Sequence, residues 1–100
     1  MFSSNRVWLV TGTSLGFGKA YIEVLLSKGY NVAATTRTKA IIEAEFGKES
    51  EHFLPLNLNV KNKEDVVRVV SEVKLKFGRI DCLINNAGYA LVGFVEEVDE

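Results

Sequence analysis

Residues 6–19 read Arg-Val-Trp-Leu-Val-Thr-Gly-Thr-Ser-Leu-Gly-Phe-Gly-Lys, an apolar run followed at once by a glycine-rich turn. The run from Arg6 to Thr11 is rich in β-branched and aromatic residues and stops at Gly12, which is typical of a buried parallel strand. Apolar residues then recur at helical spacing over residues 17–28, and Gly29 follows as a helix-ending signal. The stretch therefore predicts a strand, a tight turn and a helix.

The same alternation continues along the chain. Apolar runs predict further strands at residues 30–36, 52–60 and 80–85, and helical spacing predicts helices at residues 39–46 and 62–77, with a candidate start of another helix at residues 93–100. Asn62 and Asp65 can cap the second of these helices, and Gly78 can end it. Pro55 cannot donate a ladder hydrogen bond, so we expect its strand at an edge of the sheet or with a bulge.

Strands that alternate with helices of this length predict an α/β fold, with a doubly wound parallel sheet covered by helices on both faces. Four predicted strands occupy residues 6–85, whereas a complete dinucleotide-binding domain has six strands. We therefore expect residues 1–100 to form the N-terminal part of one Rossmann-type domain, with the first four strands only.

Composition excludes several function classes. The 100 residues include 12 Lys and Arg against 13 Asp and Glu, a net charge of −1, which gives no basic footprint for nucleic acid or an anionic membrane. One Cys and one His exclude an internal disulfide and disfavour a metal site. The apolar run of residues 7–10 is too short for a leader or a membrane span. We expect a soluble protein of the reducing cytoplasm.

The glycine-rich turn is a candidate phosphate cradle. Gly12 allows a sharp turn, Gly16 lets the backbone approach a pyrophosphate, and Gly18 lets the helix pack against the strand, while the N–H groups at the helix start face the anion. Ser14 can add a hydroxyl donor. The alternative is a merely tight turn without a ligand. The candidate contacts with a dinucleotide in this turn are Gly12, Thr13, Ser14, Leu15, Gly16, Phe17 and Gly18.

Two other phosphate-binding arrangements fit the sequence less well. A P-loop has four residues between its glycines and then Lys-Ser or Lys-Thr, whereas here five residues separate Gly12 from Gly18 and Ala20 follows Lys19. A Rossmann-type methyltransferase usually has an acidic residue at the end of the second strand, where this chain has Arg37 and two threonines. A dinucleotide cofactor is therefore the favoured ligand.

Arg37 follows the second predicted strand, where dinucleotide-binding domains place an acidic residue for NAD or a basic one for NADP. A guanidinium can bind the 2′-phosphate through its two-pronged fork. The alternative is an ordinary solvated loop arginine. The residue favours NADP over NAD.

Two motifs carry a resemblance to a known family. Thr11-Gly12-x-x-x-Gly16-x-Gly18 resembles the cofactor motif of short-chain dehydrogenases/reductases. Asn85-Asn86-Ala87-Gly88 is similar to that family's Asn-Asn-Ala-Gly motif, whose small residues lie beside the cofactor and whose asparagines brace the sheet. The resemblance covers residues 6 to about 98 and implies cofactor contacts at Asn86, Ala87 and Gly88.

Leu58-Asn59-Val60 resembles the family's Leu-Asp-Val, in which the Asp accepts a hydrogen bond from adenine. The resemblance implies cofactor contacts at Asn59 and Val60, with Asn in place of Asp. An amide oxygen can still accept from the adenine amino group. The alternative for Asn59 is a turn-capping role.

The resemblance implies an oxidoreductase that moves hydride between NADP(H) and an alcohol or carbonyl substrate, as a homo-oligomer in its complete form. The family's catalytic Tyr precedes a Lys by four residues, but Leu25, Ala34 and Gly93 occupy that position after the three tyrosines. The family's catalytic Ser and Asn are also absent, so no catalytic residue is assigned. A non-catalytic nucleotide-binding module or a truncated gene product remains the alternative.

Overall fold

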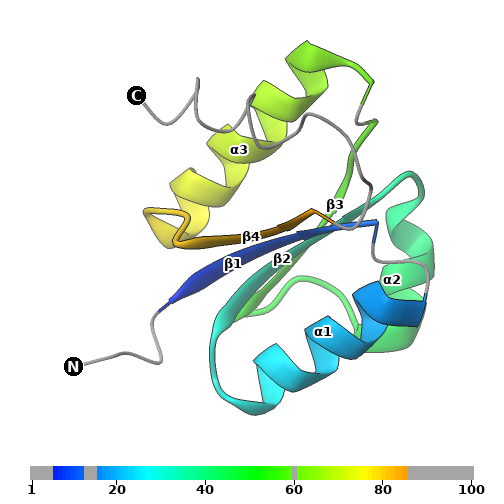
Figure 1. Cartoon of the computed structure of the whole chain (residues 1–100), viewed down its shortest axis with the longest axis vertical. Helices are drawn as coiled ribbons and strands as arrows, with labels where there is room; N and C mark the ends of the chain where they lie inside the picture. Colours follow the sequence, from blue (N-terminus) through cyan, green and yellow to red (C-terminus); the bar gives the residue numbers. More distant parts are fainter. Residues whose placement is uncertain (1–5, 13–15, 60, 86–100) are drawn as a thin grey trace.

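Strands and helices alternate along the chain in the predicted order. The structure, a computed structural model, describes residues 6–12, 16–59 and 61–85. Within these residues the elements are β1 (Val7–Thr11), α1 (Gly16–Ser27), β2 (Asn31–Thr36), α2 (Lys39–Phe46), β3 (Phe53–Asn57), α3 (Lys63–Phe77) and β4 (Cys82–Asn85). The strands pair in parallel in the order β3-β2-β1-β4 (Figure 1). This arrangement confirms the doubly wound α/β prediction.

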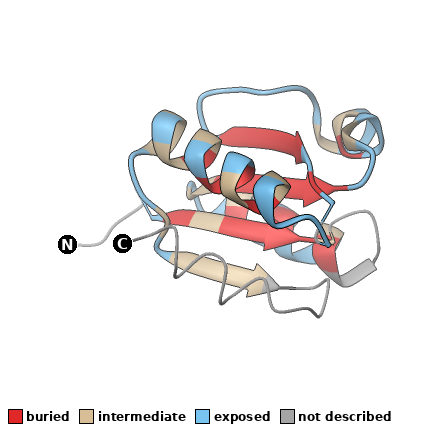
Figure 2. Ribbon diagram, turned by 90° about the horizontal axis from the view of Figure 1, so that it is seen from above, coloured by how far each residue is buried: buried red, intermediate tan, exposed pale blue. Residues whose placement is uncertain are grey.

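The sheet lies between two helical layers, with α1 and α2 on one face and α3 on the other (Figure 1). Side chains alternate between these faces along each strand. Leu9 packs in the cluster that includes the valines of α3, whereas Val10 packs in the cluster that includes Ile22 of α1 and Ile42 of α2. Strands β1, β2 and β3 are therefore buried on both faces over most of their length, as Figure 2 shows.

α3 begins and ends with the capping residues that its sequence predicts. The side chain of Asn62 accepts a hydrogen bond from the Asp65 N–H at the start of the helix. Gly78 ends the helix in the left-handed conformation, with φ of 90°, which a glycine adopts without strain. The face that packs on the sheet consists of Val66, Val69, Val70 and Val73.

β3 lies at one end of the strand order, as Pro55 predicts. The carbonyl of His52 accepts from Val32 of β2, and the N–H of Leu58 donates to Thr36 of β2. Because bonding alternates along a strand, the even-numbered residues of this segment bond to β2. Pro55 is an odd-numbered residue, so its missing N–H costs no ladder bond.

Some details differ from the sequence-based expectations. The strands predicted at residues 52–60 and 80–85 begin at Phe53 and Cys82, and the first of them ends at Asn57. Two apolar residues of α1, Tyr21 and Val24, are exposed on its outer face. Cys82 is half-buried, because β4 has a neighbouring strand on one side only among the described residues. Residues 93–100 lie outside the described residues.

Candidate functional site

The carboxyl ends of the strands bring several of the predicted site residues to one edge of the sheet. Thr36 of β2 lies opposite Asn57 of β3, and the N–H of Leu58 donates to the carbonyl of Thr36 at 2.8 Å. Arg37 and Asn59 follow directly in sequence. In open α/β sheets ligands bind outside the carboxyl ends of the strands, so this edge is the candidate site.

The turn after β1 has the backbone geometry that its glycines predict. Gly12 has a φ of 65°, in the left-handed region that an L side chain rarely adopts. α1 then begins at Gly16, and Gly18 in its first turn is buried. The N-terminus of α1 therefore starts at the same sheet edge, where its unpaired N–H groups can receive an anion. Thr13, Ser14 and Leu15 lie outside the described residues.

A pocket of about 240 Å³ lies where β2 and β3 end. Arg37 contributes an exposed guanidinium from the loop after β2, and Asn59 contributes from the turn after β3. The full lining comprises Arg37, Asn57, Leu58, Asn59, Asp65 and Arg68. The pocket therefore combines Arg37 and Asn59, which the sequence assigns to the adenosine end of a dinucleotide, with two further residues at the end of β3 and two of α3.

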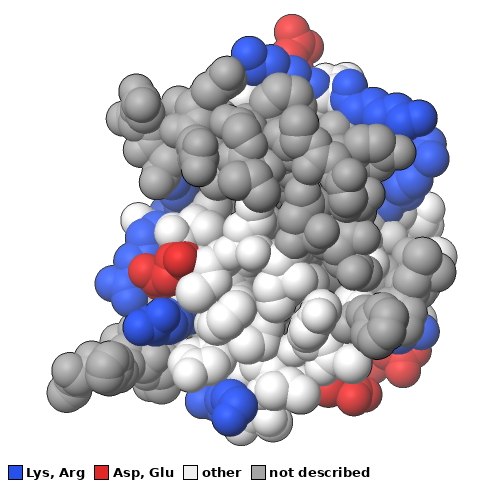
Figure 3. Space-filling view, in the orientation of Figure 1, with Lys and Arg blue, Asp and Glu red and all other residues white. Residues whose placement is uncertain are grey.

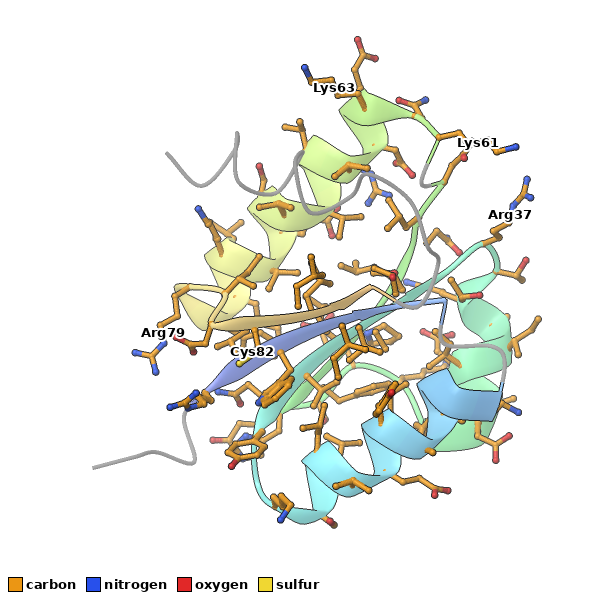
Figure 4. All side chains as sticks on the ribbon, in the orientation of Figure 1. Arg37, Lys61, Lys63, Arg79 and Cys82 are labelled. Atoms are coloured by element: carbon orange, nitrogen blue, oxygen red, sulfur yellow. The ribbon has the colours of Figure 1, made fainter. Side chains whose placement is uncertain are left out.

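Two cations stand at the rim of this pocket. Arg37 and Lys61 lie near each other at the carboxyl edge and point outward (Figure 4). Figure 3, in the same orientation, shows Lys and Arg atoms exposed at that margin. Among the described residues neither side chain forms an ion pair with a carboxylate, unlike Lys39, which faces Glu43 at 4.0 Å. Both cations are thus available to an anionic ligand.

Asn59 is held in a turn by its own neighbours. Its Oδ1 accepts a hydrogen bond from the Lys61 N–H at 3.1 Å, and its N–H donates to Asp65 Oδ2 at 2.7 Å. The side-chain oxygen therefore has the turn-capping role that the sequence left open as the alternative. Its amide NH₂ remains a possible donor to a ring nitrogen of a base. Val60 lies outside the described residues.

Asp65 and Arg68 form an ion pair beside this turn. The Asn59 N–H lowers the pKa of Asp65, burial opposes this, and Arg68 adds to the lowering. Hydrogen bonds to Asp65 and Glu72 raise the pKa of Arg68. The pair therefore stays charged throughout the physiological pH range, and the turn keeps its hydrogen bonds.

Sequence reasoning missed two residues of this arrangement. Arg68 was not singled out, although Asp65, Arg68 and Glu72 have the i, i+3 and i, i+4 spacing of helical ion pairs. Asn57 was read as a strand residue, but its Oδ1 accepts from the Lys39 N–H at 2.7 Å and so caps α2. Thr38, the residue before α2, makes no such bond with its side chain. Sequence alone carries no signal for this cap between elements.

A larger pocket, of about 390 Å³, lies at the opposite edge of the sheet. Its cations are neutralised locally: Lys76 pairs with Glu49 at 3.0 Å and Arg79 with Asp81 at 2.8 Å. His52 is exposed there, and its Nδ1 lies 2.8 Å from Asn31 Oδ1. Among the described residues these two cations of the pocket are thus paired with carboxylates, unlike Arg37 and Lys61 at the carboxyl edge.

Other kinds of site find no support in the described residues. No group of three or more His, Cys, Asp and Glu residues among them is placed to hold a metal ion. None of their helices combines the length and the apolar character that crossing a membrane requires. Asn86, Ala87 and Gly88 lie outside the described residues.

The known proteins that this chain resembles are oxidoreductases. A family model described as short chain dehydrogenase matches residues 6–100. An oxidoreductase of Botryotinia fuckeliana is 40% identical over 97 residues, which cover 94% of this chain and 35% of that protein. An oxidoreductase of Schizosaccharomyces pombe is 42% identical over 96 residues, which cover 96% of this chain and 32% of that protein.

Solved structures agree with the sequence comparisons. A 3-ketoacyl-(acyl-carrier-protein) reductase of Brucella melitensis, complexed with NADH, superposes with a TM-score of 0.71 at 29% identity, covering 78% of this chain and 32% of that one. The chain thus spans about a third of the length of the relatives it matches.

Proposed function

The chain belongs to the short-chain dehydrogenase family, and from that premise we propose that it forms the cofactor-binding part of an NADP-preferring oxidoreductase. The complete protein would transfer hydride between the nicotinamide and an alcohol or carbonyl compound. One observation carries the proposal: the left-handed turn at Gly12 and the exposed Arg37 follow adjacent parallel strands and so lie at the same sheet edge. A dinucleotide laid across that edge meets both.

The pyrophosphate is assigned to the turn between β1 and α1. The positive φ of Gly12 turns the chain sharply, and Gly16 begins the helix immediately beyond the turn. A helix N-terminus presents N–H groups and a partial positive charge to an anion. The contacts proposed here are the backbone of Gly12, Gly16 and Gly18 with Thr13, Ser14, Leu15 and Phe17 between them.

The adenosine is assigned to the pocket between the ends of β2 and β3. Asn59 lines it, with its amide NH₂ as a donor, and Val60 and the segment Asn86-Ala87-Gly88 are proposed as further contacts. Arg37 lies at its rim, and the nearby Lys61 reinforces the positive charge. A 2′-phosphate carries the negative charge that this rim would attract, so the residues fit NADP better than NAD.

A non-catalytic nucleotide-binding module is the second candidate. Neither tyrosine in the described residues, Tyr21 or Tyr30, has a lysine four residues later, so these residues supply no acid or base for hydride transfer. In the enzyme that we propose, catalysis would depend on residues beyond those described. We further propose a cytoplasmic location, because a single Cys suits a reducing compartment, and a homo-oligomeric complete protein, as expected from the family.

The test of the proposal is dinucleotide binding by the full-length protein with Gly16→Val. A branched side chain at this position would occupy space that the pyrophosphate needs. We expect the variant to lose at least about a hundredfold in affinity for NADPH, the loss of two or more hydrogen bonds to a charged group. Fluorescence titration with NADPH measures the dissociation constant.

Ala44→Val is the matched control, because it adds the same side chain to an exposed position on α2. The control should keep the wild-type dissociation constant. Equal NADPH affinity in wild type and Gly16→Val would contradict the assignment of the cradle. A wild-type protein that binds no dinucleotide would contradict the proposed function as a whole.

A further inference from the structure

The guanidinium of Arg68 makes hydrogen bonds within α3 and to the end of β3. Nη2 donates to the carbonyl of Asn57 at 2.7 Å and to Asp65 Oδ1 at 2.8 Å, and Nε donates to the same oxygen at 2.9 Å. Nη1 donates to Glu72 Oε2 at 2.7 Å. A planar guanidinium can donate these hydrogen bonds at the same time, because its N–H groups point in several fixed directions. Arg68 thus fastens α3 to the carboxyl end of β3.

The partners of Arg68 extend this connection to both walls of the adenosine pocket. Asp65 uses its other oxygen, Oδ2, to accept from the Asn59 N–H. Asn57 uses its side chain to cap the Lys39 N–H at the start of α2, just after the loop that carries Arg37. One guanidinium is therefore linked to the turn that presents Asn59 and to the loop that presents Arg37.

The stability of the fold gives little reason for this arrangement. The side chain of Arg68 is 43% exposed, and an exposed ion pair contributes little to the free energy of unfolding. The valine face of α3 already holds the helix on the sheet. What the network fixes is the relative position of two short segments, both of which line the pocket.

We propose that Arg68 is a positioning residue for the adenosine pocket, which sets the turn after β3 and, through Asn57, the loop that carries Arg37. The inference rests on the proposed function. Arg68 differs from Arg37 because four of its hydrogen bonds are already made within the protein. It therefore acts on the nucleotide through the residues it holds.

Arg68→Ala in the full-length protein tests the inference with two half-ligands. Adenosine 2′,5′-bisphosphate occupies the adenosine side, and reduced nicotinamide mononucleotide occupies the other side. We expect the dissociation constant for the bisphosphate to rise about tenfold, the effect of one lost hydrogen bond of good geometry. The dissociation constant for the mononucleotide should not change, whereas general loosening of the fold would affect both.

Two controls separate positioning from stability. Arg79→Ala removes an arginine that pairs with a carboxylate at the opposite edge of the sheet. Glu72→Gln removes the charge of the one Arg68 partner that does not touch the turn after β3. Both should keep the wild-type dissociation constant for the bisphosphate. If Arg68→Ala does not fold, Asp65→Asn weakens the same link and should raise that constant in the same direction.

The outcomes distinguish this inference from the proposed function. An unchanged dissociation constant for the bisphosphate in Arg68→Ala, or in Asp65→Asn where that variant is needed, overturns the positioning role and leaves the function standing. Equal weakening of both half-ligands, or equal weakening in Arg79→Ala, also overturns it. A wild-type protein that binds neither half-ligand overturns the proposed function and the inference together.

Discussion

Arg37 and Arg68 line the same pocket, but their surroundings give them different roles. Arg37 is exposed and forms no ion pair with any described residue, so its guanidinium can receive a phosphate. Arg68 has its donors directed at Asn57, Asp65 and Glu72. The difference lies in the partners of the two side chains rather than in the residue type, and sequence alone does not show those partners.

Arg37→Asp should reverse the cofactor preference of the full-length protein. An aspartate would repel the 2′-phosphate of NADPH and accept from the free ribose hydroxyls of NADH. Loss of a charge-assisted hydrogen bond corresponds to about 10- to 150-fold in affinity for NADPH. Titration of wild type and variant with both cofactors gives the ratio of dissociation constants.

Lys48→Asp makes the same change of charge at an exposed position beyond the far end of α2. This control should leave the ratio unchanged. If Arg37→Asp also leaves the ratio unchanged, Arg37 is an ordinary solvated arginine and the preference for NADP has another origin.

The role of the Asn59 side chain could not be predicted from the sequence alone. The family motif and a turn-capping role were both open for it, and the spacing could not decide between them. The structure gives its side-chain oxygen to the Lys61 N–H. This hydrogen bond depends on where α3 begins and on the Asp65 carboxylate, which accepts from the Asn59 N–H. A local sequence pattern does not contain these contacts.

Whole elements were more predictable than single side chains. The β-branched runs of β1 and β2, the valine spacing of α3 and the glycines after α1 and α3 all identified elements that the structure contains. Strand ends were less predictable, because an apolar residue beyond a strand can still be buried. Leu58 is an example: it follows β3, yet it packs in the core on the α3 side.

Asp81 connects β1 to β4 at the amino edge of the sheet. Its Oδ2 accepts from the Val7 N–H at 2.8 Å and from Arg79 Nε at 2.8 Å, while its own N–H donates to the carbonyl of Val7. Burial raises the pKa of Asp81, but the Val7 N–H and Arg79 outweigh it, and the pKa falls below its ordinary value of 3.8.

The contribution of Asp81 to stability should therefore depend on pH. Because the folded-state pKa is lowered, the stabilisation is fully present above the unfolded-state pKa and is lost as the pH falls through the folded-state pKa. Asp81→Asn should be less stable than wild type at neutral pH, and this difference should shrink below pH 3.8. Urea unfolding of both proteins across this range measures it; a difference that stays constant into strong acid would contradict the prediction.

At the scale of the whole molecule, the strand order assembles the site from distant parts of the sequence. β1 lies between β2 and β4, and β3 follows β2 outward. The glycine turn, the Arg37 loop and the turn after β3 therefore lie in succession along one edge. The relatives are about three times as long as this chain.

A crystal structure of the full-length protein with NADPH tests the central claim most directly. The account predicts the pyrophosphate at the start of α1, the adenine between the ends of β2 and β3 beside Asn59, and the 2′-phosphate within hydrogen-bond distance of Arg37. NADPH bound at the amino edge beside His52, or no bound NADPH at a saturating concentration, would contradict it.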